Sequence, residues 1–254
     1  MPAAGDAPLF TYVLGLADDA LVLGHRLSEW SGHAPMLEED IALSNLALDL
    51  IGQARLLYTY AGEVEGKGRD EDRLAYFRGA QEFRNVLLVE QPNGDFAATM
   101  VRHFLYAAFM HPYYSALALS RDPQLAGIAA KAVKEMAYHL RHASEWIIRL
   151  GDGTAESRRR ATQALDDLWG YTGELFEMDA GEASLAASGL AVDRARIKAP
   201  WEEKVTRVLR EATLERPADR YMQTGGRAGR HGEQLGKMLA EMQVLARAHP
   251  AVTW

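Results

Sequence analysis

Side chains able to bind a metal ion recur at helical spacing in one stretch of this sequence. Glu135 and His139 are four residues apart and His142 follows three residues later, so a helix would place all three on one side. Carboxylates and imidazoles suit iron or manganese, and the chain has no cysteine to offer instead. Glu135 with His139 is therefore a candidate metal pair. The alternative, which we favour, is a hydrogen-bonded Glu–His ladder where two helices meet.

A dinuclear metal centre in a helical bundle would need more acids than the chain supplies. Two helices of such a bundle provide one Glu each, and the other two provide Glu-x-x-His on one face. The segment 96–120 contains no Asp or Glu, and its His103 and His111 are eight residues apart, too far to share one turn. We expect His103 to be a hydrogen-bonded core histidine. Asp49 lies one position off an apolar stripe, which favours a hydrogen-bonded acid over a ligand.

The inward positions where ligands would be expected carry side chains that bind iron poorly or not at all. Leu50 and Gln53 share the i, i+3 spacing on the apolar stripe of their helix, where Glu and His would stand. Met136 lies three residues before His139, and a thioether is a poor ligand for iron. Ala20 shares the stripe of the first helix with leucines. These positions predict a metal centre that has been lost.

Helical periodicity runs through nearly the whole chain. Apolar residues recur at i, i+3 and i+4, strand-like alternation is not sustained anywhere, and Asp95 and Thr154 are predicted caps. We expect a surface excursion without helix over residues 179–200 and loops over 62–72 and 216–230. Long helices with short breaks predict an all-α antiparallel bundle with additional C-terminal helices. The expected helices are 9–30, 36–61, 73–89, 96–120, 122–150, 154–178, 201–214 and 231–248.

Composition and charge exclude several classes of function. With 254 residues, 48% hydrophobic and 25% charged, one domain spanning residues 1–254 is expected. A net charge of −7 disfavours a nucleic-acid partner, and the basic run 158–160 is expected to be a solvated helix face. The absence of cysteine excludes disulfides and iron–sulfur clusters. No uninterrupted apolar run reaches the ~18 residues of a membrane span, so we expect a cytoplasmic protein.

Several stretches, taken together, resemble the C subunits of phenylacetyl-CoA epoxidases. The resemblance covers nearly the whole chain. Set against the motifs of the catalytic subunit of that enzyme, Leu50 and Gln53 replace the Glu and His of the first Glu-x-x-His. Met136 replaces the Glu of the second, and only His139 is kept. The stretches that carry the resemblance are residues 43–55, 135–141, 149–154, 225–233, 238–243 and 250–254.

The resemblance implies a ferritin-like fold and a place in a multi-subunit monooxygenase of aerobic phenylacetate breakdown. In that assembly an A subunit of similar fold holds the di-iron centre and the CoA thioester. A reductase with FAD and an iron–sulfur cluster supplies electrons from NADPH, and the complex also includes a small B subunit. The C subunit is implied to be a non-catalytic structural partner of A that carries no cofactor, and it could self-associate when isolated.

Two other functions stay open at this stage. One is an oxidase or monooxygenase with its own noncanonical metal site built from some of Asp49, His103, Glu135 and His139. The other is an interaction module unrelated to oxygenation. For the structural role, the aromatic pair Tyr113-Tyr114, taken as exposed, and the terminal Trp254 are candidate partner contacts, each weighed against a place in the core.

Overall fold

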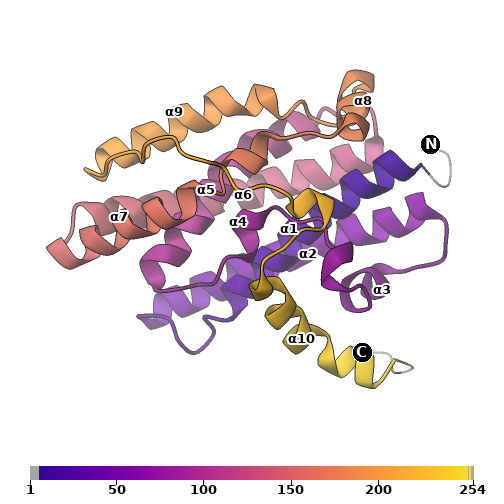
Figure 1. The fold of residues 1–254 in the computed structure, drawn as a ribbon, viewed down its shortest axis with the longest axis horizontal. Coiled ribbons are helices and arrows are strands. Elements are labelled where there is room, and N and C mark those ends of the chain that lie inside the picture. Colours follow the sequence, from indigo (N-terminus) through magenta and orange to yellow (C-terminus); the bar gives the residue numbers. More distant parts are fainter. Residues whose placement is uncertain (1–5, 251, 253–254) are drawn as a thin grey trace.

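Four long helices form the body of the molecule and lie side by side in two pairs (Figure 1). The computed structural model describes residues 6–250 and 252. The helix α1 packs along α2, α5 packs along α6, and α2 also meets α6. No strand occurs in the part of the chain that is described, so the predicted all-α class is confirmed. The bounds are α1 Ala7–Ser28, α2 Leu37–Glu65, α5 Phe96–Leu117 and α6 Pro123–Gly151.

The remaining helices cover this body or extend from it. The helices α7 and α9 pack on α5, α8 packs on α1, and α10 meets the short helices α3 (Glu71–Tyr76) and η1 (Ala80–Glu82). Figure 1 shows α10, in yellow, projecting from the body. The predicted C-terminal helices are thus present. Their bounds are α7 Ala155–Trp169, η2 Gly173–Phe176, α8 Ala180–Ser188, α9 Ala195–Glu211, η3 Gly226–Ala228 and α10 Glu233–Ala248.

Side chains with oxygen acceptors set the starts of α5, α6 and α7. Asp95 accepts a hydrogen bond from the amide of Ala98 at 2.9 Å and so caps α5, as predicted. Thr154 caps α7 in the same way through the amide of Ser157. Asp122 accepts the amides of Gln124 and Leu125 ahead of α6. These caps satisfy amides that have no partner inside the helix.

The predicted continuous helix over 73–89 is wrong. The chain instead forms three short pieces: α3 Glu71–Tyr76, η1 Ala80–Glu82 and α4 Leu87–Glu90. The cause lies in α1, where Asp18 accepts the amide of Arg84 and Asp19 accepts the amide of Val86, each at 2.7 Å. Because these amides donate to α1, they are not available for a helical ladder.

The predicted excursion over 179–200 is also wrong, because it contains α8 and the first turns of α9. Asp179 caps α8 through the amide of Glu182. The helix α8 is rich in alanine and buries only Leu185, so it gives little apolar periodicity. Conversely, α7 ends at Trp169 rather than near 178. Past that end, the carbonyl of Gly170 accepts the amide of Gln223 from a distant loop.

The first helix is the only described helix that is long and apolar enough to cross a membrane. However, 78% of its apolar window is buried inside the structure. Packing against α2 therefore accounts for its apolar character.

Candidate functional site

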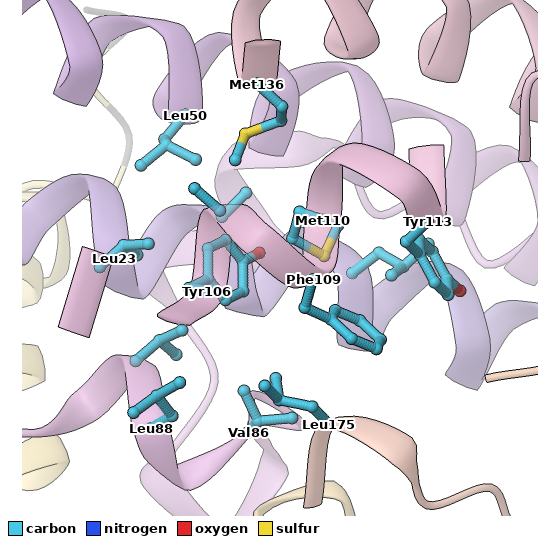
Figure 2. Packing of buried hydrophobic residues seen from close by; sticks show 14 of the residues in the cluster. Leu23, Leu50, Val86, Leu88, Tyr106, Phe109, Met110, Tyr113, Met136 and Leu175 are labelled. Atoms are coloured by element: carbon cyan, nitrogen blue, oxygen red, sulfur yellow. The ribbon is translucent and has the colours of Figure 1, made fainter. Parts of the chain in front are cut away.

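The positions predicted to replace metal ligands are buried in the hydrophobic core. Ala20, Leu50 and Met136 have no exposed surface. Figure 2 shows Leu50 of α2 and Met136 of α6 pointing toward one another, with Tyr106 of α5 nearby. Gly24 of α1 lies against the same part of α2, since a Cβ added there would be 3.3 Å from the Cβ of Leu50. We call the region around Leu50 and Met136 the packed centre.

Beside the packed centre, polar side chains join α2 to α6. The Nε2 of Gln53 donates to Oε2 of Glu135 at 2.9 Å, and Nε2 of His139 lies 3.3 Å from Oδ2 of Asp49. We expected a ladder of Glu–His hydrogen bonds where two helices meet. Instead, Glu135 and His139 of α6 each bond to a side chain of α2. Asp49 is a hydrogen-bonded acid, as expected. Further along the seam, His142 Nε2 lies 2.9 Å from Oε2 of Glu39.

His103 is a core histidine, but its surroundings differ from the expectation. It is fully buried, and its ring centroid lies 5.1 Å from that of His139. Neither of its ring nitrogens has a hydrogen-bond partner among the described residues. Burial lowers the pKa of His103 well below its usual range, and the neighbouring His139 adds to the effect. The imidazole is therefore neutral at physiological pH. His111 lies near the other end of α5, away from this pair.

The residues at the packed centre do not fit a di-iron site. Such a site uses four carboxylates and two histidines facing one another. Across the described residues, no group of three or more His, Cys, Asp or Glu side chains lies close enough to hold a metal ion. This applies to the four candidate ligands of the noncanonical site, Asp49, His103, Glu135 and His139. The geometry of the described residues gives no support to the noncanonical metal site.

The aromatic pair taken as an exposed candidate partner contact is buried, so its expected exposure is wrong and the alternative, a place in the core, is confirmed. Tyr113 and Tyr114 are at most 1% exposed. The hydroxyl of Tyr113 lies 2.7 Å from that of Tyr12, and its ring stacks on Phe109. The pair is covered because α5 packs against other helices on several sides, α6, α7 and α9 among them. Trp254 lies outside the described residues.

A second group of buried acids was not identified from the sequence. Asp18 accepts from Arg78 Nη1 at 3.0 Å and from the hydroxyl of Tyr58. Asp19 accepts from Arg227 Nη2 at 2.6 Å. Burial raises the pKa of Asp19, while the charge of Arg227 opposes that rise. The signal was available, because two adjacent aspartates interrupt an otherwise apolar helix.

Two further acids bind the backbone of the glycine-rich segment near the C-terminus. Glu174 accepts the amides of Leu87 at 2.7 Å, Gly225 at 2.9 Å and Arg227 at 3.3 Å. Glu90 accepts the amide of Gly232 and Nδ1 of His231, each at 2.7 Å. Although burial alone would lower the pKa of His231, the hydrogen bond to Glu90 raises it. These acids fix irregular backbone, which makes them structural.

One face of α2 carries apolar side chains that no described element covers. Leu37 is 72% exposed and Leu48 is 65% exposed, with Ile41 and Leu56 on the same side. Their separations of four, seven and eight residues return to one side of a helix. We call these four residues the α2 stripe. On the neighbouring α6, Tyr138 is also exposed. Apolar side chains gathered on one surface are typical of an interaction site.

Residues 1–254 match the family model described as phenylacetic acid catabolic protein. The chain is 49% identical over 246 residues to the C subunit of 1,2-phenylacetyl-CoA epoxidase from Escherichia coli (strain K12). The match covers 97% of this chain and 99% of that relative. The chain therefore belongs to the phenylacetic acid catabolic protein family.

Proposed function

We propose that this chain is a non-catalytic structural subunit of a ring-1,2-phenylacetyl-CoA epoxidase in aerobic phenylacetate degradation. In this role it is one cytoplasmic, ferritin-like domain that pairs with a di-iron A subunit of similar fold. The observation that carries the proposal is the packed centre. It occurs in a chain that is 49% identical to the C subunit of such an epoxidase. Leucine and methionine are buried where a catalytic bundle would hold carboxylates.

The energetics of the packed centre favour a structural role. Carboxylates gathered in a core repel one another until a cation neutralises them. A buried leucine or methionine instead contributes about 1.5–3 kcal/mol without any ion. The neutral amide of Gln53 also satisfies Glu135 directly. A bundle of this composition can therefore keep its shape without metal, which suits a scaffold.

The α2 stripe supports the pairing. A partner subunit with an apolar helical face would cover Leu48 and its neighbours and remove them from water. The adjacent helix α6 exposes Lys134 and Arg141. These cations fit a partner whose apolar face has an acidic border on that side. The stripe is also where we expect self-association when the A subunit is absent. The small B subunit and the reductase, with its FAD and iron–sulfur cluster, complete the proposed assembly.

Co-expression with the A subunit tests the proposal. We expect the two chains to elute together in size exclusion, and turnover of phenylacetyl-CoA with reductase, NADPH and oxygen to need the A subunit. Leu48→Asp should weaken the pairing by at least about tenfold, because a charge would be buried in the interface. Leu119→Asp is the matched control, since Leu119 is 84% exposed and outside the α2 stripe. Turnover by this chain alone, or equal pairing of both variants, would contradict the proposal.

A further inference from the structure

An asparagine followed by a glycine lies in the irregular turn over residues 91–95, between α4 and α5. Asn93 is half-buried and Gly94 is exposed. Gly94 has a φ of +59°, and its amide donates no hydrogen bond to the part of the chain that is described. Because glycine has no Cβ, nothing on this residue hinders its nitrogen from approaching the neighbouring side chain. The packed centre and the α2 stripe do not include this turn.

Three hydrogen bonds hold the side-chain amide of Asn93 in one orientation. Its Nδ2 donates to the carbonyl oxygen of Arg26 and to Oε2 of Glu29, each at 2.8 Å. Its Oδ1 accepts from Nη2 of Arg102 at 2.5 Å. Only Oδ1 can accept and only Nδ2 can donate, so these partners determine which end of the amide faces Arg102.

Arg102 is a buried cation without a counter-ion. It has no exposed surface, and its Nε has no hydrogen-bond partner among the described residues. Its Nη1 donates to the carbonyl oxygen of Gln91, which is neutral. Burial and the nearby charge of Arg26 lower the pKa of Arg102 to about 9, so the guanidinium group is still charged at neutral pH. Because water does not screen this charge, it would strongly stabilise a negative charge on Oδ1 of Asn93.

We propose that Asn93 is a self-modification site, at which the amide nitrogen of Gly94 attacks Cγ of Asn93 while Arg102 stabilises the oxyanion that forms on Oδ1. A donor that is already in place where negative charge develops lowers the barrier to such an attack. The two reacting groups belong to adjacent residues, so the reaction needs water but no substrate or cofactor. This inference does not depend on the proposed function.

The reaction proceeds in two steps and changes no oxidation state. In the first step the bond between the nitrogen of Gly94 and Cγ of Asn93 forms, and the bond between Cγ and Nδ2 breaks. The amide of Gly94 loses its proton to solvent, and Nδ2 gains one proton from solvent and leaves as ammonia. In the second step water opens the cyclic imide, which gives aspartate or isoaspartate.

The conversion to aspartate exchanges two donated hydrogen bonds for a negative charge. The new carboxylate would supply the counter-ion that Arg102 of α5 lacks. The carbonyl oxygen of Arg26 and the carboxylate of Glu29, both near the end of α1, would lose their donor. The modification therefore strengthens the contact of the turn with α5 and weakens its contact with α1.

Peptide mass spectrometry of the full chain tests the inference by following the converted fraction of Asn93 over time in mildly alkaline buffer. The reference is the same chain unfolded in guanidinium chloride at the same pH and temperature. We expect conversion to be at least about tenfold faster in the folded chain, because only folding places Arg102 at Oδ1. Asn45 and Asn85 are internal controls that should stay unconverted, since bulky residues follow them.

Two variants then test the part played by the guanidinium group. Arg102→Met keeps an unbranched side chain but removes the charge and the donors, so it should slow the conversion in the folded chain by at least about tenfold. Arg141→Met is the matched control. Arg141 is exposed on α6, where it lies over the ring of Tyr138.

Faster conversion in the folded chain, slowed by Arg102→Met but not by Arg141→Met, supports the site. Conversion that is no faster in the folded chain than in the unfolded chain overturns it, because the turn then protects Asn93. Equal rates in the two variants also overturn it, because Arg102 then has no part in the reaction. If Arg102→Met fails to fold by thermal melt, the comparison of the folded and unfolded natural chain decides alone.

Discussion

Gln53 of α2 and Glu135 of α6 are joined by one hydrogen bond, with 2.9 Å between Nε2 and Oε2. In a Glu-x-x-His motif of a metal-binding bundle, a histidine would stand at the position of Gln53. An amide donates to a carboxylate with no cation between them, so the side chain of Glu135 is satisfied by protein alone. This bond and the buried side chains of Leu50 and Met136 hold α2 and α6 together without a metal ion.

The first prediction concerns Leu50. Leu50→Glu should lower the free energy of unfolding by several kcal/mol, because it places an unpaired charge in the core. Urea denaturation followed by circular dichroism measures the change. Leu48→Glu on the same helix is the control and should cost less than about 0.5 kcal/mol, since Leu48 is exposed. Equal stability of the two variants would show that the centre around Leu50 is not tightly packed.

The buried ion pair between Asp18 and Arg78 gives the second prediction. Asp18→Ala should cost about 3–5 kcal/mol, because Arg78 would remain buried without its carboxylate. The exposed pair of Asp219 with Arg216 is the comparison, and Asp219→Ala should cost less than about 1 kcal/mol. Equilibrium unfolding of both variants checks the difference. Similar small losses would mean that the network of Asp18 does not hold the segment 78–86 in place.

How far the sequence predicts the fold can be judged from particular elements. The long helices follow from local spacing and their caps at Asp95 and Thr154 form as predicted, although α7 ends at Trp169, earlier than expected. The break between α3 and α4 could not be predicted locally, because the carboxylates that capture the amides of Arg84 and Val86 lie more than sixty residues away.

In the candidate site, too, some features follow from the local sequence and others depend on tertiary contacts. Leu50, Gln53 and Met136 could be identified from their positions on helix stripes. The burial of Tyr113 could not, because it depends on distant parts of the chain, such as Tyr12 of α1 and the later helices that pack on α5. Glu174 likewise accepts the amides of Leu87 and Gly225, which lie far from it in the sequence. The spacing of residues along the sequence does not predict these contacts.

The third prediction is a pH dependence carried by His231. Its pKa is raised in the folded state through Glu90, so its contribution to stability is complete below the unfolded value of about 6.5. That contribution is lost as the pH rises through the folded pKa. His231→Gln should therefore destabilise the protein by about 1–3 kcal/mol at pH 6, and by less at pH 9. Chemical denaturation at both pH values measures it, and an equal cost at both would refute the charged pair.

The most direct measurement is elemental analysis of the chain purified from cells supplied with iron and manganese, paired with thermal melts with and without EDTA. If Leu50 and Met136 fill the centre of the bundle, the metal content should be far below one ion per chain. The melting temperature should also be unchanged by the chelator. Stoichiometric iron or manganese, together with a large fall in melting temperature on chelation, would contradict the structural role and identify His139 and Glu135 as metal ligands.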